Sequence, residues 1–322
     1  MSRKRTLLLA LLLLPFVQAR PSLAHGSHGG GGDVPEAGEF NFTPVITLEG
    51  HGGFENNLED DPKHYALDGL FGGVFQWGLG SGGSLSIEAA VGPSLVWGEA
   101  EHFYGVVHTD DHHDDHDDDD HDDHDDDDHD DHAHDHGDTS YKRTDVRGFF
   151  QVRYAPNDRL SVSVDWKPYY VTRNQGDANR GLKNDIGAEV VWALGDGDLN
   201  FSLGDGLESL ADGLFISLEH RQGWESDGTW IGNYTDSRVG LGFIVGKDQI
   251  NVKLDGGPRF YTPGSYSGLN QRTDFAGELE VSVPVGEATL FAHWQPTYSS
   301  VNATGWGEGW QHHVGTGVTF SF

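Results

Sequence analysis

Hydrophobic and polar residues alternate one by one over long stretches of the chain, which is the period of a β-strand with two unlike faces. The C-terminal segment WQHHVGTGVTFSF is the clearest example. Every second residue belongs to one face, which carries Trp310, His312, Val314, Thr316, Val318, Phe320 and Phe322. The residues between them are smaller or polar, so the segment is predicted to be a strand.

The pattern recurs about twelve times and predicts an all-β fold. The expected strands lie near 43–52, 64–78, 84–102, 141–154, 159–172, 182–194, 213–224, 234–245, 249–261, 270–284, 287–299 and 309–322. Their connections alternate in length. One set is short (80–83, 156–158, 246–248 and 285–287), with a longer member near 195–212 that has room for a small extra element. The other set is long and polar (53–63, 103–140, 173–181, 225–233, 262–269 and 300–308).

Alternation alone does not identify the buried face, because a soluble β-sandwich alternates too. Three further features favour a membrane barrel. Short turns at one end and long loops at the other are typical of outer-membrane barrels, and strands of about ten residues can cross a bilayer when tilted. Aromatic residues gather near strand ends, at Trp97, Trp166, Tyr170, Trp192, Trp294, Tyr298 and Trp310. The polar face carries charges of both signs, which indicates a wet interior.

The chain has an N-terminal export signal, an even number of amphipathic strands and a final strand GTGVTFSF that ends in Phe322. In these features it resembles bacterial outer-membrane β-barrel proteins of the porin-like channel type. The resemblance covers about 43–322. It implies a closed antiparallel transmembrane β-barrel, contact with outer-membrane lipid, and recognition of the C-terminal Phe322 by the outer-membrane assembly machinery. It also implies that both termini and the short turns face the periplasm, whereas the long loops face outwards.

The N-terminus has the parts of a cleaved signal peptide: the basic MSRKR, the apolar TLLLALLLLPFV and the small-residue SLA that ends at Ala24. The alternative, a retained membrane anchor, is disfavoured because the apolar run is short for a span. We therefore expect a signal peptide at 1–24, a periplasmic His/Gly-rich leader at 25–42 and a barrel at 43–322. The chain has no cysteine, so the exported protein needs another source of stability. Closure of the barrel supplies one, because it pairs every strand edge.

One segment departs from the strand pattern and dominates the charge. Residues 108–136 hold ten of the 19 histidines, and their seventeen aspartates contribute −17 to the formal net charge of −32. An eight-residue repeat, HDDHDDDD, runs through the segment, and we expect it to be a disordered extracellular loop within 103–140. The net charge disfavours nucleic acid as a partner.

Repeated pairs of histidine three residues apart indicate binding of a divalent transition metal, with zinc as the first candidate. The candidate ligands are His108, His112, His113, His116, His121, His124, His129, His132, His134 and His136. Calcium is less favoured, because the segment lacks the glycine turn of a Ca²⁺-binding loop. The simpler alternative is a solvated acidic loop, but aspartate alone would serve that purpose.

A second candidate metal site lies on the inner face of the predicted barrel. Strand pairing estimated from the turns brings His293 beside His313, and closure of the last strand on the first brings His313 beside His51. Glu280 or Glu278 would then support the three imidazoles. The alternative is three unrelated histidines that line the pore.

These features together predict an outer-membrane channel that captures zinc or a related metal on its external loop and admits it to the periplasm. The metal is then a substrate, and no cofactor is required. Two alternatives stay open: a surface protein for metal buffering or resistance whose barrel is an anchor, and a general small-solute porin. The sequence lacks both a Gly-x-Ser-x-Gly and a His-Glu-x-x-His motif, so no enzyme activity is expected.

Overall fold

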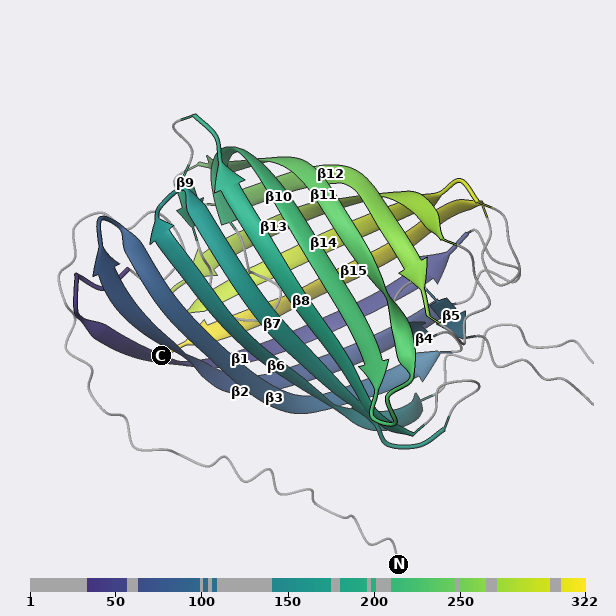
Figure 1. The fold of residues 1–322 in the computed structure, drawn as a ribbon. Helices are drawn as coiled ribbons and strands as arrows, with labels where there is room; N and C mark the ends of the chain where they lie inside the picture. The colour runs from purple at the N-terminus through teal and green to yellow at the C-terminus, as the bar shows by residue number, and fades with distance from the viewer. Residues whose placement is uncertain are drawn as a thin grey trace, which may run out of the picture.

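The computed structural model describes residues 34–56, 63–98, 101–103, 106–108, 141–174, 180–195, 198–200, 210–246, 250–264, 271–301 and 308–322. These residues form a closed antiparallel β-barrel (Figure 1). Its wall consists of twelve long strands: β1 (Phe40–Glu55), β2 (Lys63–Gly80), β3 (Gly83–Gly98), β6 (Tyr141–Asn157), β7 (Leu160–Val171), β8 (Gly181–Ala193), β10 (Leu210–Glu225), β11 (Trp230–Val245), β12 (Ile250–Pro263), β13 (Arg272–Val285), β14 (Ala288–Ser299) and β15 (Gly309–Ser321). The predicted closed all-β barrel of about twelve strands is confirmed, and each long strand overlaps a predicted one.

The barrel closes where the last strand meets the first. β15 pairs with β1 in a register that sets Ser321 opposite Val45, and the backbone N–H of Phe322 donates to the carbonyl of Pro44 at 3.1 Å. Because closure leaves no unpaired edge among the long strands, the backbone can be satisfied within the wall without disulfides.

The outer surface of the barrel is apolar. Val91, Val239 and Leu254 are each more than half exposed, and many other large apolar side chains share that surface. A belt of this extent would be costly to hydrate, so it marks the face that contacts lipid. No helix in the described part of the chain is long and apolar enough to cross a membrane.

The interior of the barrel is polar, which confirms the predicted inward face. Asp145, Asp236 and Glu280 are at most 2% exposed, although all three carry carboxyl groups. A small apolar cluster of Val191, Ala193, Leu199 and Phe215 lies at the end where the short turns gather. Its Leu199 belongs to the short strand β9 (Asp198–Asn200), which pairs with β10 and matches the small extra element expected near 195–212.

The structure corrects three boundaries. The polar connection expected at 225–233 is only the turn 226–229, because β10 and β11 continue to Glu225 and from Trp230. The first strand begins at Phe40, inside the expected leader. The strand expected to reach 102 ends at Gly98, and a short hairpin of β4 (Glu101–Phe103) and β5 (Val106–His108) follows it. The start of the His/Asp-rich loop is therefore paired backbone rather than unstructured.

The predicted signal peptide at 1–24, the part of the predicted leader from 25 to 33 and the tract from His112 to His136 lie outside the described residues.

Candidate functional site

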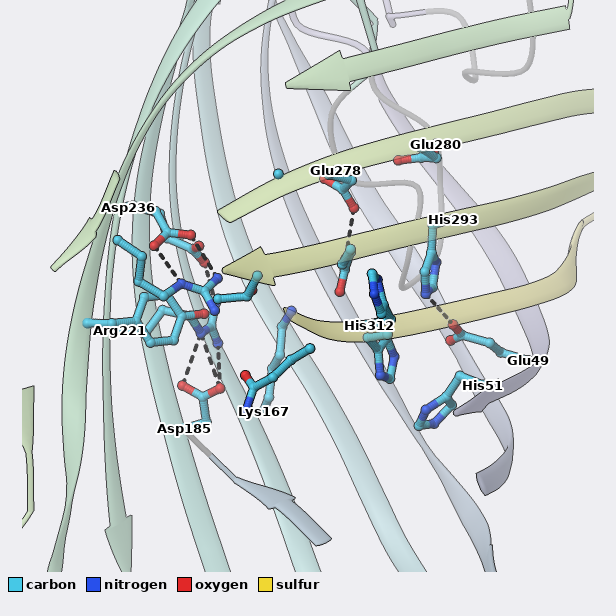
Figure 2. Close-up of a pocket in the computed structure, with 18 of the residues that line it drawn as sticks. Glu49, His51, Lys167, Asp185, Arg221, Asp236, Glu278, Glu280, His293 and His312 are labelled. Atoms are coloured by element: carbon cyan, nitrogen blue, oxygen red, sulfur yellow. Dashed lines mark hydrogen bonds and ion pairs between the residues drawn. The ribbon is translucent and has the colours of Figure 1, made fainter. Parts of the chain in front are cut away.

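A cavity of about 580 Å³ occupies the lumen and is lined by residues from all twelve long strands (Figure 2). Its wall has two chemically different sides. Histidines and carboxylates gather on β14, β15, β1 and β2, whereas arginines and lysines paired with carboxylates occupy the side from β6 to β13.

Four histidines form a continuous cluster on the first side. The ring centroid of His313 lies 5.1 Å from that of His51, 5.7 Å from that of His293 and 5.9 Å from that of His64. Four neighbouring strands contribute one imidazole each, and His313 contacts the other three. We call His51, His64, His293 and His313 the histidine wall.

A carboxylate orients the first member of this wall. Nε2 of His51 lies 3.2 Å from Oδ2 of Asp68, which also accepts a hydrogen bond from Nη1 of Arg147. An ionised carboxylate can only accept, so Nε2 of His51 is the donor, and in the neutral imidazole Nδ1 then carries the lone pair. Nδ1 of His51 is buried and makes no hydrogen bond within the described part of the chain.

A second carboxylate faces His293. Nε2 of His293 lies 3.6 Å from Oε1 of Glu49, and both side chains are 7% exposed. The gap exceeds a hydrogen bond, and this Nε2 has no hydrogen-bond partner among the described residues. The close approach depends on Gly315, because a Cβ there would lie 2.4 Å from Nε2 of His293 and 2.8 Å from Oε1 of Glu49.

The histidine wall begins near the root of the His/Asp-rich loop. His64 is the second residue of β2 and pairs with Gly98, the last residue of β3. Gly98 is the last residue of the wall before the β4–β5 hairpin, and the His/Asp-rich tract follows that hairpin in the chain. The histidine wall therefore begins at the end of the barrel where β3 ends and continues into the lumen.

Paired charges fill the opposite side. Arg221 is 4% exposed and contacts three carboxylates: Asp165 at 2.6 Å, Asp185 at 3.1 Å and Glu219 at 2.9 Å. A buried guanidinium with this many acidic neighbours is held in one place by charge-assisted hydrogen bonds.

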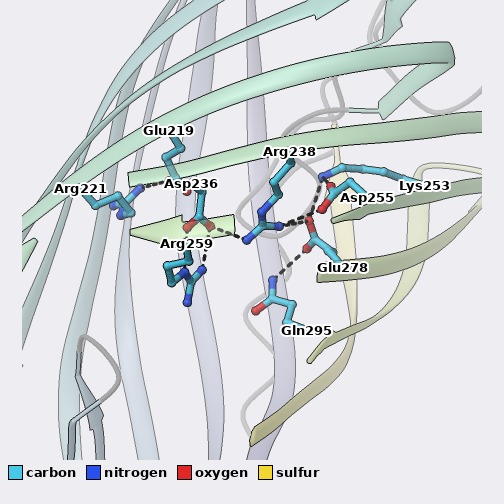
Figure 3. Close-up of polar contacts among 9 residues, drawn as sticks. All are labelled: Glu219, Arg221, Asp236, Arg238, Lys253, Asp255, Arg259, Glu278 and Gln295. Atoms are coloured by element: carbon cyan, nitrogen blue, oxygen red, sulfur yellow. Dashed lines mark hydrogen bonds and ion pairs between the residues drawn. The ribbon is translucent and has the colours of Figure 1, made fainter. Parts of the chain in front are cut away.

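A second network continues along β11, β12 and β13 (Figure 3). Asp236 receives hydrogen bonds from Arg238 at 2.6 Å and from Arg259 at 2.8 Å. Lys253 reaches Glu278 at 2.9 Å. Because each cation faces a carboxylate, this side of the lumen is charged but locally neutralised.

The predicted proximity of His51, His293 and His313 is found in the structure, while metal binding by them stays a prediction. Glu280 is the residue directly opposite His293 across β13 and β14. Glu278, the other candidate, instead contacts Lys253 and accepts a hydrogen bond from Gln295. In the described part of the chain, no three His, Asp or Glu side chains close around one metal position.

Sequence reasoning missed Glu49, His64 and Asp68. Glu49 is two residues from His51 and therefore shares its inward face, so the alternation could have identified it. His64 and Asp68 share the inward face of β2 in the same way. Their nearness to His51 depends on the β1–β2 register, which a long connecting loop does not reveal.

The chain was compared with known proteins. Residues 206–322 match the family model described as "Cyanophage outer membrane protein like beta barrel domain", and no curated protein matches the chain in sequence. The outer-membrane channel COG4313 from Pseudomonas putida F1 superposes with a TM-score of 0.50 at 12% identity, over 94% of this chain and 100% of that one. The likeness shows the fold of a bacterial outer-membrane barrel.

Two further solved structures are less similar. The translocator domain of the autotransporter NalP from Neisseria meningitidis has a TM-score of 0.43 at 12% identity and covers 89% of this chain and 90% of its own. The anion-selective porin from Comamonas acidovorans has a TM-score of 0.35 at 11% identity and covers 88% and 99%.

Proposed function

We propose that this outer-membrane barrel is a channel for divalent transition metal, with zinc as its first cargo. The segment from His108 to His136 captures the ion outside the cell, and the lumen admits it to the periplasm. The observation that carries the proposal is the position of the histidine wall. It starts at His64, opposite Gly98, the last wall residue before the β4–β5 hairpin and the tract that follows it in the chain.

The His/Asp-rich loop and the histidine wall offer the same types of metal ligand. Imidazole and carboxylate together suit zinc and its neighbours in the transition series, and both the loop sequence and the lumenal wall offer this combination. A loop with many equivalent ligand pairs holds each ion weakly, because ordering a flexible segment costs conformational entropy. Weak capture raises the local concentration of the ion and still permits its release into the lumen.

The opposite side of the lumen supports passage of a small ion rather than a large solute. Arg221, Asp165 and Asp185 form a compact cluster that occupies space inside the wall. Since Asp165, Asp185 and Glu219 already pair with Arg221, an incoming metal ion meets its strongest available ligands on the histidine wall.

The same paired charges favour a second candidate function. A lumen filled by its own ion pairs would not conduct, and the barrel would then anchor a metal-buffering loop at the cell surface. Zinc entry into vesicles separates the two functions.

Purified protein is reconstituted into liposomes that enclose a zinc-sensitive dye, and zinc is added outside. A channel gives dye signal faster than protein-free liposomes do, and removal of the loop slows entry at low zinc concentration but not at saturating concentration. Binding of zinc without entry would show that the barrel is an anchor. Entry at the same rate with and without the loop at every zinc concentration would contradict capture by the loop.

A further inference from the structure

The distance between Glu49 and His293 is unusual for a carboxylate and an imidazole buried together. Their nearest atoms are 3.6 Å apart. Two ligand atoms on a tetrahedral zinc ion are separated by about 3.4 Å, given metal–ligand bonds of about 2.1 Å. The observed gap is therefore too long for a hydrogen bond and close to the spacing at which one ion would bridge both atoms.

The burial of His293 points to a missing partner for its imidazole nitrogen. Both side chains are 7% exposed, and an imidazole nitrogen buried without a hydrogen bond costs free energy. Nε2 of His293 is such an atom within the described residues. A bound cation would satisfy this nitrogen, and the carboxylate of Glu49 lies close enough to share the same cation.

The imidazole rings of the histidine wall are also spaced closely enough to share a metal ion. Two imidazoles on one tetrahedral zinc ion place their ring centroids about 5 Å apart, by the same bond lengths. His313 lies 5.7 Å from His293 and 5.1 Å from His51. Asp68 lies within hydrogen-bonding distance of Nε2 of His51, and Nδ1 of the same ring is buried without a hydrogen bond among the described residues. A carboxylate on the distal nitrogen is the usual second partner of a metal-binding histidine.

We propose that Glu49, His293 and His313 form a transit site for a divalent transition metal ion, and that His313 shares the ion with His51. This transit site rests on the proposed function, which supplies the identity of the bound ion. Small side-chain rotations bring the ligands onto one ion, and water completes the coordination. A site with few protein ligands holds its ion loosely, as passage requires.

The site assigns the carboxylate ligand to Glu49 and not to Glu280, and it requires Gly315. Any side chain at position 315 would push His293 and Glu49 apart. Gly50 provides the matched control. It lies between Glu49 and His51 on β1, and the nearest atom to an added Cβ is 4.0 Å away, on Leu67.

Zinc binding is measured by titration calorimetry on the full-length barrel in detergent, in a background where the ten histidines from His108 to His136 are glutamine. Cobalt absorption reports the coordination. In this background we expect one zinc per chain. Glu49→Gln, His293→Gln and Gly315→Ala each weaken binding at least tenfold, whereas Glu280→Gln and Gly50→Ala change it less than twofold. A heat-dependent gel shift identifies the folded variants.

Asp68 acts on the site through His51, and its effect has a separate readout. Loss of such an orienting carboxylate reduces metal affinity about 10–100-fold in other sites. We expect Asp68→Asn to weaken zinc binding in this range without moving the cobalt absorption bands, and Asp68→Glu to restore part of the affinity.

The outcomes distinguish this site from the proposed function. If Glu49→Gln and His293→Gln bind zinc as the background does, or if the background binds none while the parent chain does, the transit site is wrong and capture by the loop stands. If the parent chain binds no more zinc than the background, capture by the loop is wrong. Weakening by Glu280→Gln without weakening by Glu49→Gln would move the carboxylate to β13 and overturn the assignment.

Discussion

Gly187 and Arg221 lie opposite each other on β8 and β10, and the guanidinium occupies the space that a side chain at position 187 would fill. A Cβ on residue 187 would be 2.4 Å from Nη1 of Arg221 and 2.7 Å from Oδ1 of Asp165. The glycine thus permits the ion pairs on which this side of the lumen is built.

The first prediction follows from that contact. Gly187→Ala forces Arg221 away from its carboxylates, and we expect the free energy of unfolding to fall by about 1–3 kcal/mol, the usual cost of overpacking. Denaturant unfolding of the reconstituted barrel measures the change. Gly50→Ala, whose Cβ meets no atom closer than 4.0 Å, is the control and leaves stability unchanged. Equal stability of the two variants would show that Arg221 moves aside at no cost.

The second prediction concerns ion selectivity. Asp236 is 1% exposed and accepts hydrogen bonds from Arg238 and Arg259. Asp236→Asn removes a negative charge and leaves both guanidinium groups in the lumen. We expect the reversal potential in planar bilayers to shift towards that of the anion.

Asp227→Asn is the matched control for this measurement. Asp227 lies in the turn between β10 and β11, where its carboxylate accepts a hydrogen bond from the backbone N–H of Thr229 at 2.8 Å. The residue is outside the lumen, so its substitution leaves selectivity unaltered. A reversal potential that Asp236→Asn does not move would place the ion path away from this network.

The third prediction tests the architecture. All strands of the wall are paired with two neighbours, so the backbone hydrogen bonds are internal and resist detergent until the sample is heated. The purified protein should run at different apparent sizes on a detergent gel before and after boiling. Recovery of the mature chain in the soluble periplasmic fraction would be incompatible with the barrel.

The fourth prediction separates the loop from the barrel. Gly98 and Tyr141 are the last and first residues of two paired strands, so the wall is joined independently of what connects them. We expect a chain without 108–136 to keep its heat-dependent gel shift and to lose most of its bound zinc, as counted by calorimetry. Zinc stoichiometry that survives the deletion would show that the tract does not collect metal.

The alternation of side chains determined most of the architecture. A strand with one apolar and one polar face fits a closed barrel between lipid and water, and the residues that bound each stretch, such as those around Gly80 and Gly286, mark its turns. For this reason the twelve strands, the outward apolar belt and the inward charges follow from the sequence. Two strand boundaries differ from the prediction because β10 and β11 pair with each other beyond the alternating stretch. β10 therefore continues to Glu225, and β11 begins at Trp230.

Only the tertiary structure decided which inward residues meet. Contacts across the wall depend on register, and a shift of one residue turns every side chain to the other face. Short turns set the register for His293 and Glu280, whereas the register that places His64 and Asp68 beside His51 is set across a long loop. The approach of Glu49 to His293 depends on a glycine of the strand between them, Gly315, and on closure of the barrel. Such a contact has no counterpart in the linear pattern, because it joins residues 244 positions apart.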